Sequence, residues 1–419
     1  MATAQRLTAA WPADSRLIDD RRLEIGGVDA VALAREFGTP AYIVAEQDLR
    51  DRARQYLSAF RAHAPDAEIH FASKANPCTA VLRVFAEEGL GVDVASGGEL
   101  HVALKAGFEP ANIILHGNAK SEAELRRAID VGVGYVVLDN FADLERVIAL
   151  ATDTVQPVLL RVTPDVRGET HDKISTGQAD SKFGLSLADA STAIERAQAA
   201  PNLRLDGLHL HIGSQLLELG PWRDAVEAIA PLGNFPVVNL GGGLGVAYTD
   251  AEDPPSIEVY AAAKVAAARE LLGDHVRIID EPGRSLVANA GVTLYTVESV
   301  KRNVSTWVGV DGGMSDNLRP MLYGAQYEAE IADRFGGSTP SRITGKHCES
   351  GDVIVSEAPL DDPKPGDIVV TPATGAYGYA MSNNYNGIPR PPVVFVKDGD
   401  ARVVVRRETF EDLTSRDID

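Results

Sequence analysis

Short apolar segments alternate with amphipathic segments along the first two thirds of the chain. The segments 79–89, 97–107 and 121–132 carry apolar residues at helical spacing and end in glycine, where helices commonly stop. Ser121 and Glu124 have the spacing of a capping box. Eight apolar runs rich in β-branched residues predict buried strands: EIHFAS (68–73), GVDVAS (91–96), NIILHG (112–117), YVVLD (135–139), PVLLRV (157–162), LHLHIG (208–213), PVVNLGGG (236–243) and VRIIDEPG (276–283).

The order of these segments predicts a parallel barrel. Continuous apolar strands that alternate with helices form parallel sheets that are covered on both faces. In the first half, the predicted strands recur about every 22 residues, which is the length of one βα unit. Eight such units favour a closed (β/α)8 barrel of the TIM type, and an open, doubly wound sheet is the alternative.

The pattern changes after residue 290 to short or alternating strands with turn residues between them. We therefore expect an α/β protein with three segments: 1–40 packing beside the last, a barrel at 41–290, and a β domain of sandwich or small-barrel type at 291–419. The strands and turns that predict the β domain include GVTLYTVESVKRN (291–303), DVIVSEAPL (352–360), PKPGD (363–367), KDGD (397–400) and ARVVVRRET (401–409).

Charge and cysteine content narrow the possible partners and location. Lys and Arg number 40 against 60 Asp and Glu, which gives a formal net charge of −20. Such a field repels phosphate backbones and anionic lipid, so we expect neither a nucleic-acid nor a membrane partner. The only cysteines, Cys78 and Cys348, exclude a disulfide framework and favour a reducing compartment. The N-terminus is a poor signal peptide, so we expect a cytoplasmic protein.

Polar residues follow several predicted strands, at the end where barrel enzymes place their functional groups. A lysine such as Lys74, directly after HFAS, can form a Schiff base with a carbonyl compound or with pyridoxal phosphate, and a solvated lysine is the alternative. His209 and His211 lie two residues apart, on one side of their strand. Either can stack on a planar cofactor or be structural. We expect no metal, because no third ligand lies at suitable spacing.

Two further motifs follow the last two predicted barrel strands. The glycines of NLGGGLG (239–245) form either a tight structural turn or a phosphate cradle of bare backbone, although the spacing fits neither the dinucleotide fingerprint nor a P-loop. In EPGR (281–284), Glu281 and Arg284 either pair with each other or bind opposite ends of a ligand, with Glu281 on a protonated ring nitrogen. A lysine, a stacking histidine, a glycine-rich loop and an acid are the parts of a pyridoxal-phosphate site.

These motifs, taken in order, resemble those of the fold-type III (alanine racemase-like) pyridoxal-phosphate decarboxylases, and within them the diaminopimelate decarboxylase branch. The resemblance implies pyridoxal 5'-phosphate as cofactor and decarboxylation of meso-diaminopimelate to L-lysine, the last step of lysine biosynthesis. It also implies a homodimer in which the Cys-Glu loop comes from the second subunit. The motifs that carry it are FASKAN, DVASGGEL, HGNAKS, HDKISTGQADSKFG, HLHIGSQ, NLGGGLG, EPGRSL, RPMLY, CESGD and GAY.

The resemblance also implies roles for individual residues. Lys74 would hold the cofactor covalently, His211 would stack on its ring, and Glu281 would keep the ring nitrogen protonated. Together with Cys348, which would lie near the reacting carbon, these are the expected catalytic residues. The cofactor-binding set would further include Asp93, Ser214, Gly241, Gly242, Gly243, Gly283, Arg284 and Tyr377. The substrate-binding set would be Arg284, Arg319, Tyr323, Glu349 and Tyr377, with Arg319 and Tyr323 on the distal carboxylate and Glu349 on the distal ammonium group.

Two short segments depart from the pattern of that branch. Lys346-His347 stands before Cys348 where a glycine-proline is expected, and Gly387-Ile388 stands where a more polar pair is expected. Both bear on the predicted substrate pocket and leave the cofactor assignment unchanged.

Other functions are compatible with part of the pattern. A decarboxylase of the same fold can act on ornithine, arginine, carboxynorspermidine or a substrate of a specialised pathway. Arg319 argues against ornithine and arginine, because neither has a distal carboxylate to pair with it. Glu281 argues against an amino-acid racemase, and Lys74 argues against an inactive regulatory protein. The sequence leaves open whether Lys74 or Cys348 returns a proton to Cα.

Overall fold

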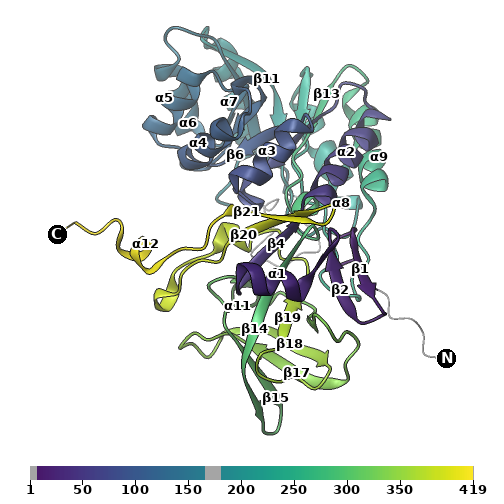
Figure 1. Cartoon of the computed structure of the whole chain (residues 1–419). Helices are drawn as coiled ribbons and strands as arrows, with labels where there is room; N and C mark the ends of the chain where they lie inside the picture. Colours follow the sequence, from purple (N-terminus) through teal and green to yellow (C-terminus); the bar gives the residue numbers. More distant parts are fainter. Residues whose placement is uncertain (1–6, 166–180, 419) are drawn as a thin grey trace. The chain divides into compact units, whose positions relative to one another are not determined.

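The computed structural model describes residues 7–165 and 181–418 and contains two compact units (Figure 1). One unit comprises Asp51–Gly245 and Pro254–Ser285, and the other comprises Met1–Arg50, Val246–Asp253 and Leu286–Asp419. Most of the predicted motif HDKISTGQADSKFG (171–184) lies outside the described residues.

The first unit is a closed barrel of eight parallel strands. Neighbouring strands pair in a ring, because β13 returns to β5 and β8 pairs with β9. The predicted barrel is confirmed, and an open sheet is excluded because no barrel strand is left at an edge. Each predicted run overlaps one strand, although β11 begins five residues before its run, and β10 (Leu185–Ser186) adds to β9. The ring is formed by β5 (Glu68–Ala72), β6 (Gly91–Val94), β7 (Ile113–Leu115), β8 (Tyr135–Leu138), β9 (Gln156–Thr163), β11 (Leu203–His209), β12 (Val237–Asn239) and β13 (Arg277–Asp280).

Amphipathic helices connect the strands, as parallel pairing requires. In α5, for example, the capping box of Ser121 and Glu124 is present, and Gly132 ends the helix in a left-handed conformation. Leu125, Ala128 and Ile129 of the same helix are buried. The helices between barrel strands are α3 (Thr79–Glu87), α4 (Gly97–Ala106), α5 (Glu122–Val131), α6 (Phe141–Leu150), α7 (Leu187–Ala199), α8 (Gly220–Ile229) and α9 (Ile257–Leu272). Helix α2 (Glu46–Arg61) precedes β5.

The second unit is dominated by β-sheet. Its large sheet has the order β18-β17-β15-β14-β4-β20-β21, with β19 pairing both β14 and β16. The strands are β4 (Ala41–Ala45), β14 (Gly291–Arg302), β15 (Thr306–Val310), β16 (Glu330–Ile331), β17 (Thr339–Thr344), β18 (Val353–Leu360), β19 (Ile368–Thr371), β20 (Val393–Lys397) and β21 (Asp400–Val405). The short helices α11 (Arg319–Tyr323) and α12 (Phe410–Thr414) belong to the same unit.

The N-terminal segment packs into the core of this second unit. Strands β1 (Ser15–Ile18), β2 (Arg22–Ile25) and β3 (Val28–Asp29) form a small sheet that leads into α1 (Ala30–Phe37). Their apolar side chains share one buried cluster with the large sheet; the cluster includes Trp11, Leu23, Leu33, Val292, Phe335 and Val394.

Strand β4 lies in this sheet, although the sequence analysis assigned the segment from residue 41 to the barrel domain. It pairs antiparallel with β14 and parallel with β20, and all five of its residues are buried. Local apolarity cannot distinguish the two locations, because a fully buried strand has the same composition in either sheet.

Among the described residues, no helix is both long enough and apolar enough to cross a membrane.

Candidate active site

Most of the predicted site residues of the barrel unit lie at or just beyond the carboxyl ends of five strands. Lys74 lies in the short 3-10 turn η1 (Ser73–Ala75) after β5, and Asp93 is the penultimate residue of β6. The other predicted residues follow β11, β12 and β13, and they are His211, Ser214, Gly241, Gly242, Gly243, Glu281, Gly283 and Arg284. In a parallel barrel these ends share one rim, so the fold brings the residues to the same rim.

The glycine-rich loop after β12 is held by close backbone contacts. A Cβ on Gly242 would lie 2.1 Å from the carbonyl oxygen of Glu281. A Cβ on Gly243 would lie 2.6 Å from the carbonyl oxygen of Gly213, and Gly243 has a φ of +118°. Only glycine allows the loops after β11, β12 and β13 to approach this closely. The tight-turn interpretation of this motif is therefore correct, and the loop also presents bare backbone on its free face.

Gly283 brings the EPGR loop against the turn that carries Lys74. A Cβ at this position would lie 3.0 Å from the Cβ of Ala72 and 3.2 Å from that of Ala75. The Ala72 amide also donates to the Pro282 carbonyl at 3.0 Å. The backbone that carries Lys74 is thus fixed directly against the backbone that carries Glu281.

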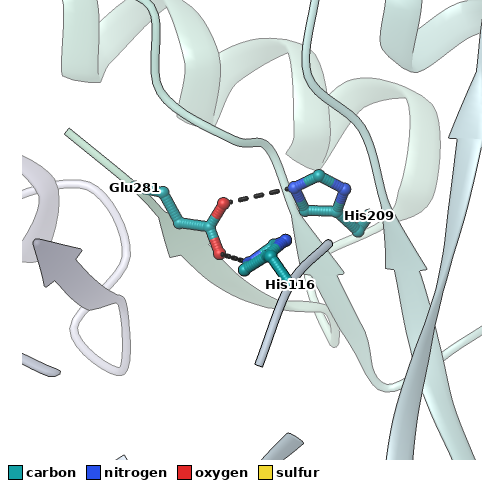
Figure 2. A group of neighbouring side chains, drawn as sticks. All are labelled: His116, His209 and Glu281. Carbon is teal, nitrogen blue, oxygen red and sulfur yellow. Dashed lines mark hydrogen bonds and ion pairs between the residues drawn. The ribbon is translucent and has the colours of Figure 1, made fainter. Parts of the chain in front are cut away.

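Glu281 is buried and receives hydrogen bonds from three side chains. His116 Nε2 lies 2.8 Å from Oε1, and His209 Nε2 lies 3.2 Å from Oε2 (Figure 2). Asn239 Nδ2 donates to Oε1 at 2.6 Å. Burial alone would raise the pKa of Glu281, but the two histidines outweigh it and hold the pKa well below its usual range. The site therefore keeps a fixed, ionised carboxylate in a desolvated position.

The sequence analysis missed His116 and Asn239. His116 directly follows β7, and Asn239 ends β12, so the available signal was a polar residue at the end of an apolar strand. The structure also separates the two histidines that the sequence left equivalent, because His209 contacts Glu281 whereas His211 lies beyond the end of β11.

His116, His209 and Glu281 also have the donor types of a zinc site. Their ligand atoms all lie within 4.8 Å of one another. The distances of 2.8 and 3.2 Å are those of direct hydrogen bonds between the histidines and the carboxylate. These bonds account for the cluster without an ion.

Lys74 acts electrostatically on two neighbours. Desolvation, and then the charge of Lys74, lower the pKa of His211 well below its usual range, so its imidazole is neutral at pH 7. Burial, and then the charge of Glu281, raise the pKa of Asp93 to about 6, although His116 and Lys74 oppose this shift. Lys74 itself is exposed and His211 is half-buried, so both side chains are accessible from the rim.

We expect the Asp93→Asn variant to stabilise the cofactor-free protein at alkaline pH. The unfolded carboxyl ionises near pH 3.9, whereas the folded one ionises near pH 6. Stability is therefore lost as the pH rises between these values, and the loss is complete above the folded pKa. The free energy of unfolding should rise by about 1–3 kcal/mol at pH 8 and change little at pH 4. Urea unfolding measures the free energy at both pH values, and the exposed Asp130→Asn variant is the control. An equal change in stability at pH 4 and pH 8 would refute the prediction.

Two arginines of the barrel unit also reach polar groups near the strand ends. Arg284 Nη2 donates to Ser214 Oγ at 2.8 Å, which joins the loops after β13 and β11. Arg161 is buried on β9, with its guanidinium 4.5 Å from the Phe183 ring centre and 3.6 Å from Asp139. The sequence analysis missed Arg161, although a charge within the apolar run PVLLRV was a usable signal.

In the second unit, Arg319 is a buried cation. It begins α11, its guanidinium lies 4.3 Å from the Tyr248 ring centre, and Nη1 donates to the Tyr327 hydroxyl. Among the described residues, no carboxylate forms an ion pair with Arg319. A buried guanidinium without an anionic partner is costly, so the position favours an anionic ligand. Tyr323 and Tyr377 of the same unit are half-buried.

The predicted Cys-Glu loop is anchored by the residues around it. Asp352 accepts from the His347 amide at 3.0 Å and from its Nδ1 at 2.7 Å. The Cys348 amide donates to Asn386 Oδ1 at 2.8 Å, and the His347 ring stacks on Tyr385. The loop is therefore held by Tyr385 and Asn386, the two residues directly before Gly387-Ile388.

The two residues of this loop with predicted roles are exposed to solvent. Cys348 and Glu349 are exposed, and among the described residues neither side chain bonds to Arg319 or Tyr323. The structure of one chain thus does not bring the predicted distal-ammonium and distal-carboxylate groups into direct contact.

Comparisons with known proteins give a consistent result. Residues 46–288 match the pyridoxal binding domain of the pyridoxal-dependent decarboxylases. The diaminopimelate decarboxylase of Actinosynnema pretiosum subsp. auranticum is 46% identical over 424 residues, which cover 98% of this chain and 96% of that protein. That of Bacillus subtilis (strain 168) is 43% identical over 430 residues, covering 96% and 97%. The solved diaminopimelate decarboxylase of M. jannaschii in co-complex with L-lysine has a TM-score of 0.92 and 33% identity, covering 98% and 99%.

Proposed function

Since the chain belongs to the pyridoxal-dependent decarboxylase family, we propose that it converts meso-diaminopimelate to L-lysine and CO2, as a diaminopimelate decarboxylase. This reaction is the last step of lysine biosynthesis. The similarity to diaminopimelate decarboxylases spans nearly the whole chain. The observation that carries the substrate is Arg319, a buried cation with no carboxylate partner among the described residues.

The residues at the barrel rim fit pyridoxal phosphate. Gly241, Gly242 and Gly243 carry no side chains that could shield their backbone amides from a phosphate, and Ser214 and Arg284 lie at the adjoining strand ends. His211 is neutral and half-buried, which suits stacking on an aromatic ring. Glu281 would hold a proton at the ring nitrogen. Asp93, Gly283 and Tyr377 complete the proposed cofactor set.

The bound cofactor supplies an electron sink for the electron pair that remains when the carboxylate leaves as CO2. Lys74 provides the amine that attaches the cofactor. Glu281 stays ionised and fixed by His116, His209 and Asn239, so its negative charge is already in place and needs no reorganisation during the reaction. In the proposal, Lys74 and Cys348 are the two candidate groups for returning a proton to Cα.

The two ends of the substrate call for opposite charges. In the proposal, Arg319 binds the distal carboxylate through its planar fork, with Tyr323 beside it, and Glu349 binds the distal ammonium group. Arg284 and Tyr377 contact the substrate near the reacting centre. A substrate without a distal carboxylate would leave the Arg319 guanidinium unpaired, which costs about 1–3 kcal/mol.

We expect Arg319→Ala to lower kcat/KM for meso-diaminopimelate about 100-fold, because a charge-assisted bond to the distal carboxylate is lost. Cofactor absorbance should stay at the wild-type level. Arg342→Ala, at an exposed arginine on β17 of the same unit, is the matched control and should leave kcat/KM unchanged. Parallel loss of cofactor and activity in Arg319→Ala would show that the distal-carboxylate role is wrong.

A product assay tests the function as a whole. The purified protein with pyridoxal phosphate is incubated separately with meso-diaminopimelate, ornithine, arginine, lysine and carboxynorspermidine, and products are identified by mass spectrometry. Formation of lysine from diaminopimelate alone is the expected result. Turnover of another substrate instead would refute the substrate assignment and direct attention to Lys346, His347, Gly387 and Ile388.

The proposal includes a homodimer with shared active sites. It is supported by the exposure of Cys348 and Glu349 on an anchored loop, since these groups have substrate roles in the proposal but face outward in a single chain. A cytoplasmic location is also proposed, because both cysteines are free thiols, which suits a reducing compartment.

Mixing two inactive variants tests the shared site. Lys74→Ala and Glu349→Ala are unfolded together and refolded as a mixture. Random pairing makes half of the dimers mixed, and each mixed dimer has one intact site, so about one quarter of wild-type activity should return. Each variant refolded alone is the control. A mixture that forms dimers but regains no activity would mean that the loop serves its own subunit.

A further inference from the structure

A buried ion pair lies beneath the glycine-rich loop of the barrel unit. Lys264 of α9 and Asp280, the last residue of β13, are almost fully buried and bond through Nζ and Oδ1. The Tyr260 hydroxyl lies 2.9 Å from Nζ and donates to Asp280 at 3.1 Å. Lys264 Nζ also lies 5.5 Å from the centre of the Trp222 ring. None of the roles proposed above uses this cluster.

The lysine of this pair extends to the loop itself. Its Nζ donates to the carbonyl oxygens of Leu240 at 3.0 Å and of Gly241 at 2.9 Å. The Gly241 carbonyl also accepts from the Glu281 amide at 3.1 Å. In a trans peptide the N–H points opposite to the C=O. Because the Gly241 carbonyl faces α9, the N–H of Gly242 is directed away from this helix.

Two of the three glycine amides of the loop are available for a ligand. The Gly241 amide donates to Asn239 Oδ1 at 2.9 Å. By contrast, within the part of the chain that the structure describes, the amides of Gly242 and Gly243 donate to no protein acceptor. Backbone amides without a partner are normally satisfied by a ligand or by water, and two adjacent ones form a site for an anion.

The pair has no evident purpose as a packing element. Burial lowers the pKa of Lys264 and raises that of Asp280. These shifts are opposed mainly by the mutual charge and hydrogen bond of the pair, with smaller contributions from Glu281 on Lys264 and from Tyr260 on Asp280. Buried ion pairs are often no more stabilising than apolar residues of the same size. Two apolar residues at these positions could not donate the two hydrogen bonds that Lys264 makes to the loop carbonyls.

We propose that Lys264, held by Asp280 and Tyr260, is a positioning residue that orients the Gly241–Gly242 peptide so that the amides of Gly242 and Gly243 bind the cofactor phosphate. This inference rests on the proposed function, because it takes the loop as the phosphate site. The inference predicts that the Lys264–Asp280 pair strengthens binding of the phosphate group and has little effect on binding of the rest of the cofactor.

The test compares two ligands that differ only in the phosphate. The full chain, freed of cofactor, is titrated with pyridoxal 5'-phosphate and with pyridoxal, and the ratio of their dissociation constants measures phosphate recognition. In the double variant Lys264→Met/Asp280→Asn, which leaves no uncompensated charge, the ratio should fall about ten-fold or more because charge-assisted bonds are misaligned. The dissociation constant of pyridoxal should stay within about three-fold of wild type.

A second buried pair of the same barrel provides the matched control. Lys120 Nζ lies 2.5 Å from both Asp143 Oδ2 and the Gly117 carbonyl oxygen, in the loop after β7. Lys120→Met/Asp143→Asn makes the same chemical change away from the glycine loop. It should lower the free energy of unfolding to a similar extent and leave the ligand ratio at the wild-type value.

The outcomes separate the inference from the function. A folded Lys264→Met/Asp280→Asn variant with an unchanged ratio would overturn the positioning role and leave the proposed function intact. A wild-type protein that shows no preference for the phosphorylated ligand would overturn the proposed function itself. If circular dichroism shows that the double variant is unfolded, Tyr260→Phe replaces it in the test. The ratio of the two dissociation constants should then fall about three-fold, and an unchanged ratio would overturn the inference.

Discussion

In the Lys74→Ala variant, we expect the cofactor to be absent from the purified protein and turnover of meso-diaminopimelate to fall by at least about 10⁴-fold. Lys74 is the exposed amine at the end of β5, on a turn fixed by the contact of Gly283 with Ala72 and Ala75. Among the residues that the structure describes, the proposed site includes no other lysine that could attach the cofactor. The measurements are the visible absorbance of the protein and a lysine-release assay.

The matched control is Lys105→Ala, at an exposed lysine on α4 of the same unit. It should retain full absorbance and activity. Added methylamine should restore part of the activity of Lys74→Ala, because the variant lacks only a primary amine. Activity near the wild-type level without any added amine would refute the assignment of Lys74.

The second large effect is expected at Glu281. The Glu281→Gln variant should lose about 10²- to 10³-fold in kcat, which is the usual cost of removing one preorganised electrostatic group. Glutamine preserves the size of the side chain but removes the negative charge that His116, His209 and Asn239 maintain. The proton on the ring nitrogen then has no counter-charge, whereas the attachment to Lys74 and the phosphate contacts are unchanged.

Steady-state kinetics and cofactor titration together check this prediction. The variant should bind pyridoxal phosphate to the same stoichiometry as wild type, with the loss confined to kcat. Glu258→Gln, at an exposed glutamate on α9, is the control and should behave as wild type. A kcat within about three-fold of wild type would show that the ring nitrogen does not depend on Glu281.

The sequence alone was sufficient to locate the eight barrel strands and the helices α3, α4 and α5. Periodicity, a capping box at Ser121 and terminal glycines such as Gly132 act over a few residues, so they can be identified in the sequence without knowledge of tertiary contacts. The same is true of the position of Lys74 and Glu281 at strand ends. The family resemblance added their expected roles, because the motifs occur in a characteristic order.

Other features were fixed only by tertiary structure. Strand β4 has the composition of any buried strand, and its location depends on β14 and β20, which lie far along the chain. His116 lies 165 residues from Glu281 and Asn239 lies 42 residues from it, yet both bond to its carboxylate. The sequence analysis did not single out Lys264, because its burial under the glycine loop arises only in the folded protein.

The physical reason for this division is the range of the interactions. Hydrophobic period, capping and turn preference are local, so the chain determines by itself which segments become strands and helices and which polar residues end them. Ring closure of the sheet then decides which strand ends become neighbours. The charge state of Glu281, the partner of Lys264 and the pairing of β4 depend on those neighbours, and so only the folded protein determined them.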